Sequence, residues 1–377
     1  MAAVRVVISG GGTGGHLFPA LAVRAALQIR RPAAEVLFVG AATGVEATIL
    51  PRLGHAFRGL SVRQVKGTSW RQKSAALLLL PRAVGEAARL LKGFDAEVVL
   101  GVGCYASFPT VVAARVTGIP AVLHEQNAYP GLANRWLGRL ATTVAVSFEA
   151  SATFFPKRKV AVTGNPVRPE IRPGDTAEAR QRLGLVPDRF TVLTFGGSQG
   201  AHRLNLAMRE GLPLLVAVRD RLQFLHATGA ADLEEMRGAY AAGGFAARVE
   251  PFFDGMATAY QAADFVICRS GASTLFELAA LGKPALLVPY PYAANDHQRR
   301  NAEHLVTAGA AWLLLDQYCD GRRLAAAVQA ALEKPALLTQ MGGAARKLAR
   351  PDAAERIVDL LEVARRRPIP SPGGREA

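Results

Sequence analysis

A glycine-rich segment near the N-terminus is the part of the sequence best suited to bind a charged group. An apolar run ends at Ile8 and is followed by Ser9-Gly-Gly-Gly-Thr-Gly-Gly-His16, after which Leu17–Ile29 has the pattern of a helix. A strand, a glycine turn and a helix start in this order can hold a phosphate, because glycines allow close approach of the backbone and the helix N-terminus attracts negative charge. His16 would then lie beside whatever the turn holds.

The same arrangement occurs a second time. Thr191–Phe195 leads into Gly196-Gly-Ser-Gln-Gly200, and the helix-like Ala201–Met208 follows. A single glycine turn would also fit any doubly wound α/β fold. Two such units predict two similar halves, each with a pocket at the ends of its strands, that face each other across a cleft.

Two polar segments follow predicted strands of the first half. Gly101–Ser107, a further glycine turn, comes after Glu97–Leu100, and His124-Glu-Gln-Asn127 comes after Ala121–Leu123. In an open α/β sheet, ligands bind beyond the carboxyl ends of the strands. Both segments are therefore candidates for ligand contact, although an ordinary polar turn also fits His124–Asn127.

Glu277 is the candidate acidic side chain of the second half. It ends Cys268-Arg-Ser-Gly-Ala-Ser-Thr-Leu-Phe-Glu277, whose small and hydroxyl residues indicate the N-terminus of a helix. Taken alone, such an acid fits a capping box better than a ligand contact. Pro289–Gln298 is a long loop, rich in hydrogen-bond donors and acceptors, that leads into another helix.

These segments must be positioned by alternating strands and helices. At 377 residues the chain exceeds one ordinary core, so we expect two doubly wound α/β domains. The Pro-containing Gly164-Asn-Pro-Val-Arg168 marks the boundary. We expect residues 1–164 to form the first domain, residues 165–350 the second, and residues 351–377 a helix over Ala353–Arg366 that can pack back on the first domain, followed by a frayed tail.

Short Val-, Ile- and Leu-rich runs between helix-length segments predict buried parallel strands. In the first half these runs are Val4–Ile8, Glu35–Val39, Glu97–Leu100, Ala121–Leu123, Thr143–Val146 and Lys159–Thr163. In the second half they are Thr191–Phe195, Leu222–His226, Arg248–Glu250, Asp264–Ile267, Ala285–Val288 and Ala311–Leu315.

Composition restricts the compartment and the partners. No apolar stretch approaches the ~18 to 20 residues of a membrane span, and the first residues read as a strand rather than a secretory signal. The three cysteines, Cys104, Cys268 and Cys319, are far apart, which favours a reducing cytoplasm over a disulfide framework or a metal knot. Residues 1–165 carry 19 Lys and Arg against 7 Asp and Glu. This basic half suits an anionic membrane surface, whereas the lack of an aromatic stacking surface argues against nucleic acid.

Trp70–Arg82 is the candidate membrane contact. It combines a tryptophan and the four leucines Leu77–Leu80 with the cations Arg71, Lys73 and Arg82. An apolar cluster bordered by cations suits shallow insertion among anionic headgroups. A core helix is the alternative, but four successive leucines cannot all face inward on a helix.

Taken in order, the motifs resemble the MurG family of bacterial glycosyltransferases over nearly the whole chain. The matching segments are Gly11-Gly-Thr-Gly-Gly-His16, His124-Glu-Gln-Asn127, Gly164-Asn-Pro-Val-Arg168, Gly196-Gly-Ser-Gln-Gly-Ala201, Arg269-Ser-Gly-Ala272 with Glu277, Gly282-Lys-Pro284 and Asp296-His-Gln298. The resemblance implies the GT-B fold, with two Rossmann-like domains, the donor in the C-terminal one and the acceptor at the N-terminal one. It also implies transfer of N-acetylglucosamine from UDP-N-acetylglucosamine to the muramyl 4-hydroxyl of undecaprenyl-linked lipid I, which forms lipid II for peptidoglycan at the cytoplasmic face of the plasma membrane.

The same resemblance implies roles for individual residues. Glu277 would hold the ribose hydroxyls, Phe253 would meet the uracil edge through its backbone, and Ser198 would cradle the donor diphosphate. The donor and substrate set is Thr13, Gly14, Gly15, Asn127, Arg168, Ser198, Phe253, Ala272, Ser273, Thr274, Leu275, Phe276, Glu277 and Gln298, and the acceptor side has Gly103, Tyr105 and Ser107. A carboxylate suits two vicinal hydroxyls, and a leaving UDP needs preorganised N–H donors. Cys104 departs from the family, which usually has glycine there.

An inverting transfer needs a base for the acceptor hydroxyl and a charge sink for the leaving diphosphate. His16 and Glu125 are the candidate catalytic bases. His16 ranks first because histidine titrates near neutrality, although a histidine at a helix start could also serve only as a hydrogen-bond donor to phosphate. The sequence has no Asp-X-Asp triplet and no His/Cys spacing typical of metal sites, so we expect no bound metal and no cofactor.

Other enzyme classes stay open at this point. A UDP-N-acetylglucosamine epimerase or a diacylglycerol glycosyltransferase could share the fold and the donor turn. An NAD-dependent oxidoreductase would require an acidic residue at the end of the second strand, where the sequence instead has Val39-Gly-Ala-Ala42.

Overall fold

The computed structural model describes residues 3–12, 14–62, 70–197 and 200–366, and the side chains of residues 70–79 lie outside the description. The chain divides into two compact units. Unit 1 comprises Met1–Arg168 and Arg350–Ala377, and unit 2 comprises Pro169–Ala349. The tail that was expected to fray, residues 367–377, is outside the described residues.

Unit 1 is built on a seven-stranded parallel sheet with the order β3-β2-β1-β4-β5-β6-β7. Its strands are β1 (Arg5–Ser9), β2 (Glu35–Ala41), β3 (Phe57–Leu60), β4 (Val98–Gly101), β5 (Ala121–Glu125), β6 (Thr143–Val146) and β7 (Val160–Val162). The strand order reverses between β1 and β4. Both glycine turns of this unit follow these two strands, at the point where doubly wound sheets bind their ligands.

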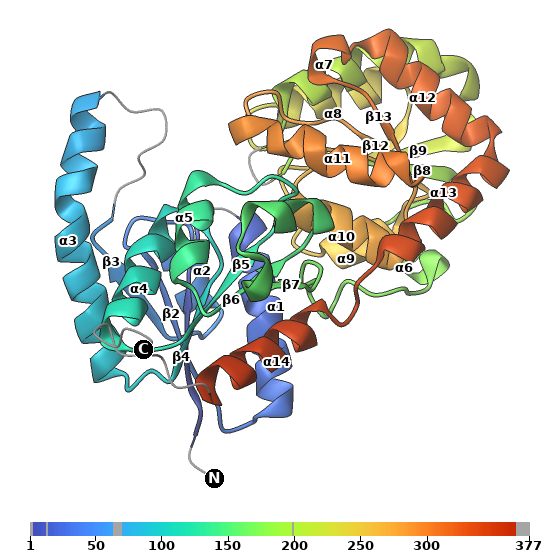
Figure 1. Ribbon diagram of the computed structural model, residues 1–377. Coiled ribbons are helices and arrows are strands. Elements are labelled where there is room, and N and C mark those ends of the chain that lie inside the picture. The colour runs from blue at the N-terminus through green and yellow to red at the C-terminus, as the bar shows by residue number, and fades with distance from the viewer. Residues whose placement is uncertain (1–2, 13, 63–69, 198–199, 367–377) are drawn as a thin grey trace. The chain divides into compact units, whose positions relative to one another are not determined.

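Helices cover both faces of this sheet (Figure 1). They are α1 (Gly14–Arg30), α2 (Glu46–Arg52), α3 (Trp70–Gly93), α4 (Cys104–Thr117), α5 (Leu132–Leu140) and α14 (Ala353–Arg366). One core joins β1 to α1 and α14 through Val6, Ile8, Leu17, Val23, Ile357 and Leu361. The opposite core joins the sheet to α3, α4 and α5 through Val7, Val99, Leu91, Val111 and Leu137. Successive residues of β1 thus serve opposite faces, as the period of a strand requires.

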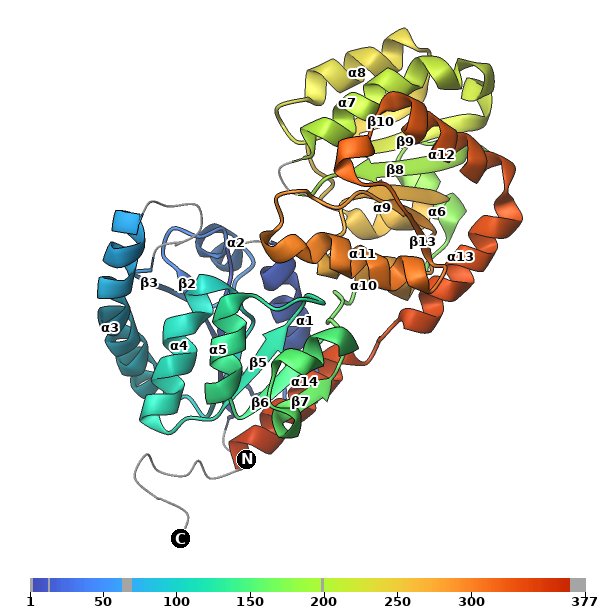
Figure 2. The same ribbon diagram turned by 45° about the horizontal axis from the view of Figure 1, so that its top comes forward.

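The last helix returns to the first half of the chain. In unit 1, α14 packs beside α1 (Figure 2). The Arg365 Nη1 to Glu97 Oε2 distance is 2.7 Å, and Arg31 Nε lies 3.1 Å from Glu362 Oε1. Such half-exposed ion pairs contribute little, so burial of the apolar face with Ile357 holds this helix in place.

Unit 2 has a six-stranded parallel sheet with the order β10-β9-β8-β11-β12-β13. Its strands are β8 (Phe190–Phe195), β9 (Leu222–Ala227), β10 (Ala246–Glu250), β11 (Phe265–Cys268), β12 (Ala285–Leu287) and β13 (Ala311–Leu313). Its α-helices are α6 (Thr176–Arg182), α7 (His202–Gly211), α8 (Leu233–Ala242), α9 (Met256–Ala262), α10 (Ala272–Leu281), α11 (His297–Thr307), α12 (Gly321–Glu333) and α13 (Pro335–Leu348). Here the order reverses between β8 and β11. The glycine turn Gly196–Gly200 follows β8, and the segment leading to Glu277 follows β11.

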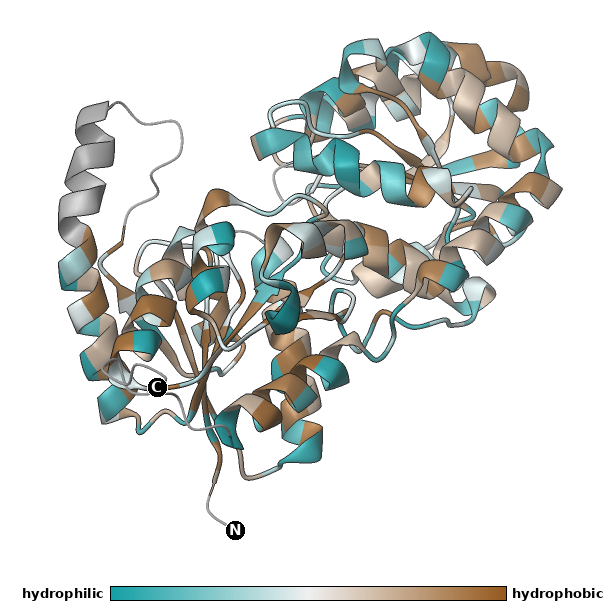
Figure 3. Cartoon of the chain, viewed as in Figure 1, coloured by the Kyte–Doolittle hydropathy of each residue, from teal (hydrophilic) through white to brown (hydrophobic). Residues whose placement is uncertain are grey.

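The predicted class of two doubly wound α/β domains is confirmed. The strands form the apolar interior of each unit (Figure 3). One strand was not predicted: β3, Phe57–Leu60, is an edge strand with two exposed residues, so it lacks the apolar run that marks a buried strand. No described helix has the length and apolar character needed to cross a membrane.

Candidate active site

The first glycine turn lies at the end of β1, but two of its amides point into the protein. The Gly10 N–H donates to the Val39 carbonyl over 3.0 Å, and the Gly12 N–H donates to Glu46 Oε2 over 2.6 Å. Glu46, the first residue of α2, is only 1% exposed. A carboxylate of the chain therefore fills the place beside Gly12, and contact with a ligand phosphate stays a prediction for the other amides of this turn.

His16 is the third residue of α1 and is half-buried. Its Nδ1 lies 2.9 Å from the Val102 carbonyl oxygen. Because a carbonyl can only accept a hydrogen bond, Nδ1 carries the hydrogen of the neutral ring and Nε2 is the basic nitrogen. This tautomer suits a general base that receives a proton at Nε2.

Glu125 ends β5 with its carboxylate turned inward. Oε1 accepts from the Asn127 backbone N–H at 2.9 Å and from Asn127 Nδ2 at 3.3 Å, and Oε2 accepts from Asn134 Nδ2 at 2.8 Å. The residue is 2% exposed, and burial raises the pKa of its carboxyl against these opposing hydrogen bonds. Glu125 thus fixes the turn that carries Asn127, and both of its oxygens are engaged.

A buried network joins His16 to the same turn. Gln126 Nε2 donates to the Val102 carbonyl at 2.8 Å and lies 3.1 Å from His124 Nδ1, while His124 Nε2 lies 3.1 Å from Ser147 Oγ. Burial lowers the pKa of His124 to about 3, so its ring is neutral, with Nδ1 accepting and Nε2 donating. The Val102 carbonyl accepts from both His16 and Gln126, which couples the two segments.

Sequence reasoning did not find Asn134 of α5. Its side-chain amide lies against the glycine turn Gly101–Ser107. A Cβ at Gly103 would be 3.1 Å from Asn134 Nδ2 and 3.3 Å from His16 Cε1. Glycine at 103 therefore allows both side chains to approach. The only signal in the sequence was a polar residue on the buried side of an amphipathic helix.

Cys104 and its neighbours form the start of α4. Cys104 has a φ of 61°, in the left-handed region that favours glycine. Tyr105 is half-buried. Ser107 is fully buried, and its hydroxyl donates to the Cys104 carbonyl over 3.0 Å, so it supports the turn from inside.

We expect Cys104→Gly to raise the free energy of unfolding by up to about 1 kcal/mol. Left-handed backbone costs a non-glycine residue about 1–2 kcal/mol, and the greater freedom of glycine in the unfolded chain offsets about 0.4–1 kcal/mol of this gain. Urea denaturation of the two proteins measures the difference. A clear loss of stability would show that the thiol contacts, including Ala106 N–H to Sγ at 3.3 Å, outweigh the strain.

The glycine turn of unit 2 follows β8 and precedes α7. Gly197 has a φ of 107° and Gly200 a φ of 77°, and a Cβ at Gly200 would lie 2.0 Å from the Thr228 carbonyl oxygen. Both the backbone conformation and the close approach thus require glycine. Ser198, like Thr13 in unit 1, is a predicted site residue outside the described part of the chain.

Glu277 lies in the second turn of α10. The residue before that helix is Gly271, which has no side chain to cap it, and the first turn contains no acid. The capping-box interpretation is therefore wrong. Glu277 as a residue is 6% exposed, and its Oε2 accepts from the Tyr260 hydroxyl over 3.0 Å.

The start of α10 suits an anion, because Gly271 before it has no side chain to cap it and the helix dipole is positive there. Ser273 and Thr274 are half-buried, whereas Ala272, Leu275 and Phe276 are buried. This end of the helix follows β11 at the reversal of strand order, beside the turn after β8.

Gln298 connects two loops beside α10. Its Oε1 accepts from the Tyr290 N–H at 2.9 Å and the Ser270 N–H at 3.2 Å, and its carbonyl accepts from Ser270 Oγ at 2.8 Å. Phe253 is 5% exposed, and across the described residues its backbone N–H and carbonyl have no hydrogen-bond partner. Arg168, assigned to unit 1, has its guanidinium carbon 4.4 Å from the centroid of the Phe18 ring.

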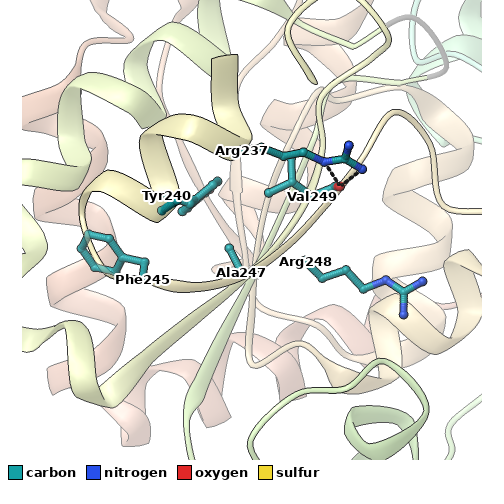
Figure 4. Close-up of a pocket in the computed structure, with 7 residues that line it drawn as sticks. Arg237, Tyr240, Phe245, Ala247, Arg248 and Val249 are labelled. Atoms are coloured by element: carbon teal, nitrogen blue, oxygen red, sulfur yellow. Dashed lines mark hydrogen bonds between the residues drawn. The ribbon is translucent and has the colours of Figure 1, made fainter. Parts of the chain in front are cut away.

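A separate hollow of about 400 Å³ lies between α8 and β10 of unit 2 (Figure 4). Arg237 and Arg248 line it with Tyr240 and Phe245. Arg237 already donates to the Val249 carbonyl, and Arg248 pairs with Glu250. None of the predicted site residues lines this hollow.

The described residues contain no group of three or more His, Cys, Asp or Glu side chains placed to hold a metal ion. Their polar groups at the strand ends are instead amides, hydroxyls, one histidine and carboxylates. Such groups suit recognition of a sugar and stabilisation of a leaving diphosphate.

Two doubly wound units with these strand-end groups fit a two-domain enzyme of the glycosyltransferase class, and the family models identify that class. Residues 6–146 match the glycosyltransferase family 28 N-terminal domain, and residues 191–357 match the glycosyltransferase family 28 C-terminal domain. The chain belongs to glycosyltransferase family 28, and within it to the MurG family.

Relatives of this family match over nearly their whole length. A Geobacter sulfurreducens protein is 44% identical over 365 residues, 97% of this chain and 100% of the relative, and a Geotalea daltonii protein is 46% identical over 364 residues, 95% of this chain and 97% of the relative. Both are named UDP-N-acetylglucosamine--N-acetylmuramyl-(pentapeptide) pyrophosphoryl-undecaprenol N-acetylglucosamine transferase. The crystal structure of Acinetobacter baumannii MurG superposes with a TM-score of 0.77 at 31% identity, covering 96% of this chain and 99% of that one.

Proposed function

We propose that this chain transfers N-acetylglucosamine from UDP-N-acetylglucosamine to the muramyl 4-hydroxyl of undecaprenyl-linked lipid I and so forms lipid II. The observation that carries the proposal is the near-complete coverage of relatives named for this reaction, at 40–46% identity. A putative UDP-N-acetylglucosamine 2-epimerase from Listeria monocytogenes shares only 14% identity. That likeness supports the common fold and no more.

The donor is proposed to bind unit 2. The start of α10, where Gly271 has no side chain to act as a cap, and the turn after β8 would meet the diphosphate. Glu277 would accept hydrogen bonds from the ribose hydroxyls. The unpartnered backbone of Phe253 supports its proposed contact with the uracil edge. Donor contacts are likewise proposed for Ser198, Ala272, Ser273, Thr274, Leu275, Phe276, Gln298 and Arg168.

The acceptor is proposed to bind unit 1. The acceptor hydroxyl attacks the anomeric carbon, its proton passes to Nε2 of His16, and the bond to UDP breaks with the electron pair on the diphosphate. Preorganised N–H groups of the turn after β8 and of the start of α10 are proposed to stabilise that charge. Thr13, Gly14, Gly15, Asn127, Gly103, Tyr105 and Ser107 are the proposed acceptor surroundings.

An acceptor comparison tests this function. The protein is incubated with UDP-N-acetylglucosamine and either a short-chain, water-soluble lipid I analogue, a diacylglycerol, or no acceptor. We expect sugar transfer to the lipid I analogue alone. Transfer to diacylglycerol, or epimerisation of the donor without an acceptor, would contradict the proposal.

The acceptor is held in a membrane, so we also propose that unit 1 docks on the anionic cytoplasmic leaflet. Side chains of most of the predicted contact, Trp70–Arg82, are outside the described residues. Helix α5 packs against α4, and α4 packs against α3, the helix that carries the predicted contact. The surface of α5 supports the proposal. Its Leu132 is 67% and its Trp136 65% exposed, and Arg139 lies over the Trp136 ring, 5.4 Å from its centroid. Exposed apolar side chains beside cations suit an anionic lipid surface.

We expect Trp136→Ser to weaken binding to vesicles containing anionic lipid about 10- to 100-fold, since insertion of a large exposed apolar side chain would contribute about 1.5–3 kcal/mol. Vesicle co-sedimentation measures the binding. Ile29→Ser is the matched control, because Ile29 is 81% exposed on α1, which covers the other face of the sheet. Equal loss of binding in both variants, or no loss in Trp136→Ser, would contradict the assignment of this face.

A further inference from the structure

Glu46 is a buried charged group that the proposed reaction leaves without a role. Its Oε2 accepts from the Gly12 N–H at 2.6 Å and its Oε1 from the Ala41 N–H at 2.9 Å. The carboxylate thus bridges the turn after β1 and the end of β2. It also lies at the start of α2, where the helix dipole favours a negative charge.

Three glycines make room for this carboxylate. A Cβ at Gly11 would lie 2.2 Å from Glu46 Cδ, one at Gly44 2.4 Å from the same atom, and one at Gly40 2.7 Å from Oε1. These separations are far below van der Waals contact. Glycines from two segments therefore form a closed cradle around an internal anion.

The charge of Glu46 also acts on Tyr105 in the glycine turn Gly101–Ser107. Burial, followed by the charges of Cys104 and Glu46, raises the pKa of the Tyr105 phenol. Within the described part of the chain, Glu46 forms no ion pair. Its charge is balanced there by backbone N–H groups, which makes its position sensitive to their geometry.

We propose that Glu46 is a positioning residue for the transfer reaction, an internal carboxylate that takes the place a phosphate occupies in a nucleotide-binding glycine turn. By fixing Gly12, it fixes the chain two residues before α1 begins at Gly14, and so helps to position His16. The inference rests on the proposed function. It also explains why unit 1 has a nucleotide-type turn without offering those amides to the donor.

Glu46→Gln is the first test. A glutamine can accept from one of the two N–H groups but turns its own NH₂ toward the other, so the turn shifts. We expect kcat to fall about 10- to 100-fold, with the donor KM within twofold because the proposed donor groups, apart from Arg168, lie in unit 2. Glu46→Asp, which keeps the charge, should restore part of kcat. Glu97→Gln is the matched control: Glu97 is also hydrogen-bonded to a backbone N–H, that of Arg5, but at the amino end of the sheet, and its kcat should stay within twofold.

A double-mutant cycle removes the ambiguity of lost stability. Gly44 has an ordinary backbone, so Gly44→Ala acts only by placing a methyl group against the carboxylate. We expect Gly44→Ala to lower kcat, and the double variant Gly44→Ala/Glu46→Ala to be no slower than Glu46→Ala, because the methyl then fits the vacated space. Gly85→Ala, where an added Cβ meets nothing within 4 Å, is the control.

Amide exchange gives a readout that does not require turnover. The Gly12 amide should exchange at least about tenfold faster in Glu46→Gln than in the unmodified protein. Equal Gly12 exchange rates, a Glu46→Gln kcat within twofold of the unmodified protein, or additive effects in the cycle would each overturn the proposal. Failure of the unmodified protein to form lipid II would overturn the proposed function instead. The exchange rate of the Gly12 amide would still test whether Glu46 holds that amide in place.

Discussion

His16→Ala is expected to lower kcat by roughly 10² to 10⁴ with little change in the donor KM. The reason is the tautomer: the Val102 carbonyl, 2.9 Å from Nδ1, assigns the ring hydrogen to Nδ1, so that Nε2 is the basic nitrogen and the proposed acceptor of the proton. Alanine removes the base, and the donor groups of unit 2 remain intact. Steady-state kinetics with a soluble lipid I analogue measures both constants.

His55→Gln is the matched control, since His55 is a half-buried histidine of the same unit that lies against the Phe38 ring. Its kcat should stay within twofold of the unmodified protein. A loss confined to the acceptor KM in His16→Ala would mean that His16 only binds phosphate. Glu125→Gln should then show the large loss of kcat. If His16 is the base, Glu125→Gln should not show this large loss of kcat, because both Glu125 oxygens already accept hydrogen bonds from Asn127 and Asn134.

Glu277→Ala is expected to raise the donor KM by about 10- to 100-fold, as the loss of about 1.5–3 kcal/mol of charged hydrogen bonding would. Glu277→Gln keeps the shape of the side chain and one acceptor oxygen, so its donor KM should lie between those of the unmodified protein and Glu277→Ala. Tyr260→Phe, which removes the hydroxyl 3.0 Å from Oε2 but leaves the carboxylate, should change the donor KM much less. The acceptor KM should be unaffected in all three.

A donor KM within twofold of the unmodified protein in Glu277→Ala, with the fold intact by circular dichroism, would contradict the ribose assignment. It would give Glu277 a purely structural role through Tyr260. The capping box no longer offers an alternative, because Gly271 precedes the helix and Glu277 lies beyond its first turn.

The fold could be predicted because strands that are buried on both faces consist of consecutive apolar residues, a pattern that is visible in the sequence. Val6, Val7 and Ile8 are apolar because both faces of β1 are covered, and the same holds for the other central strands. Edge strand β3 lacks this pattern, since two of its four residues face solvent. Strand ends also shifted by a residue or two: the second strand reaches Ala41 instead of Val39.

The site could be predicted only in part, because its geometry depends on contacts between distant residues. The tautomer of His16 is set by a carbonyl 86 positions away, and the first glycine turn is filled by Glu46, 34 positions away. Spacing alone revealed the glycines but not which anion they hold. The sequence therefore predicted a ligand phosphate beside Gly12, where the structure has the Glu46 carboxylate.

The stereochemistry of the product tests the central claim most directly. Nuclear magnetic resonance of the disaccharide made from UDP-N-acetylglucosamine and the lipid I analogue reports both the linkage and the anomeric configuration. A single displacement at the anomeric carbon predicts one product, joined to the muramyl 4-hydroxyl with the configuration inverted from α to β. Retained configuration, another linkage position, or a donor altered without transfer would contradict it.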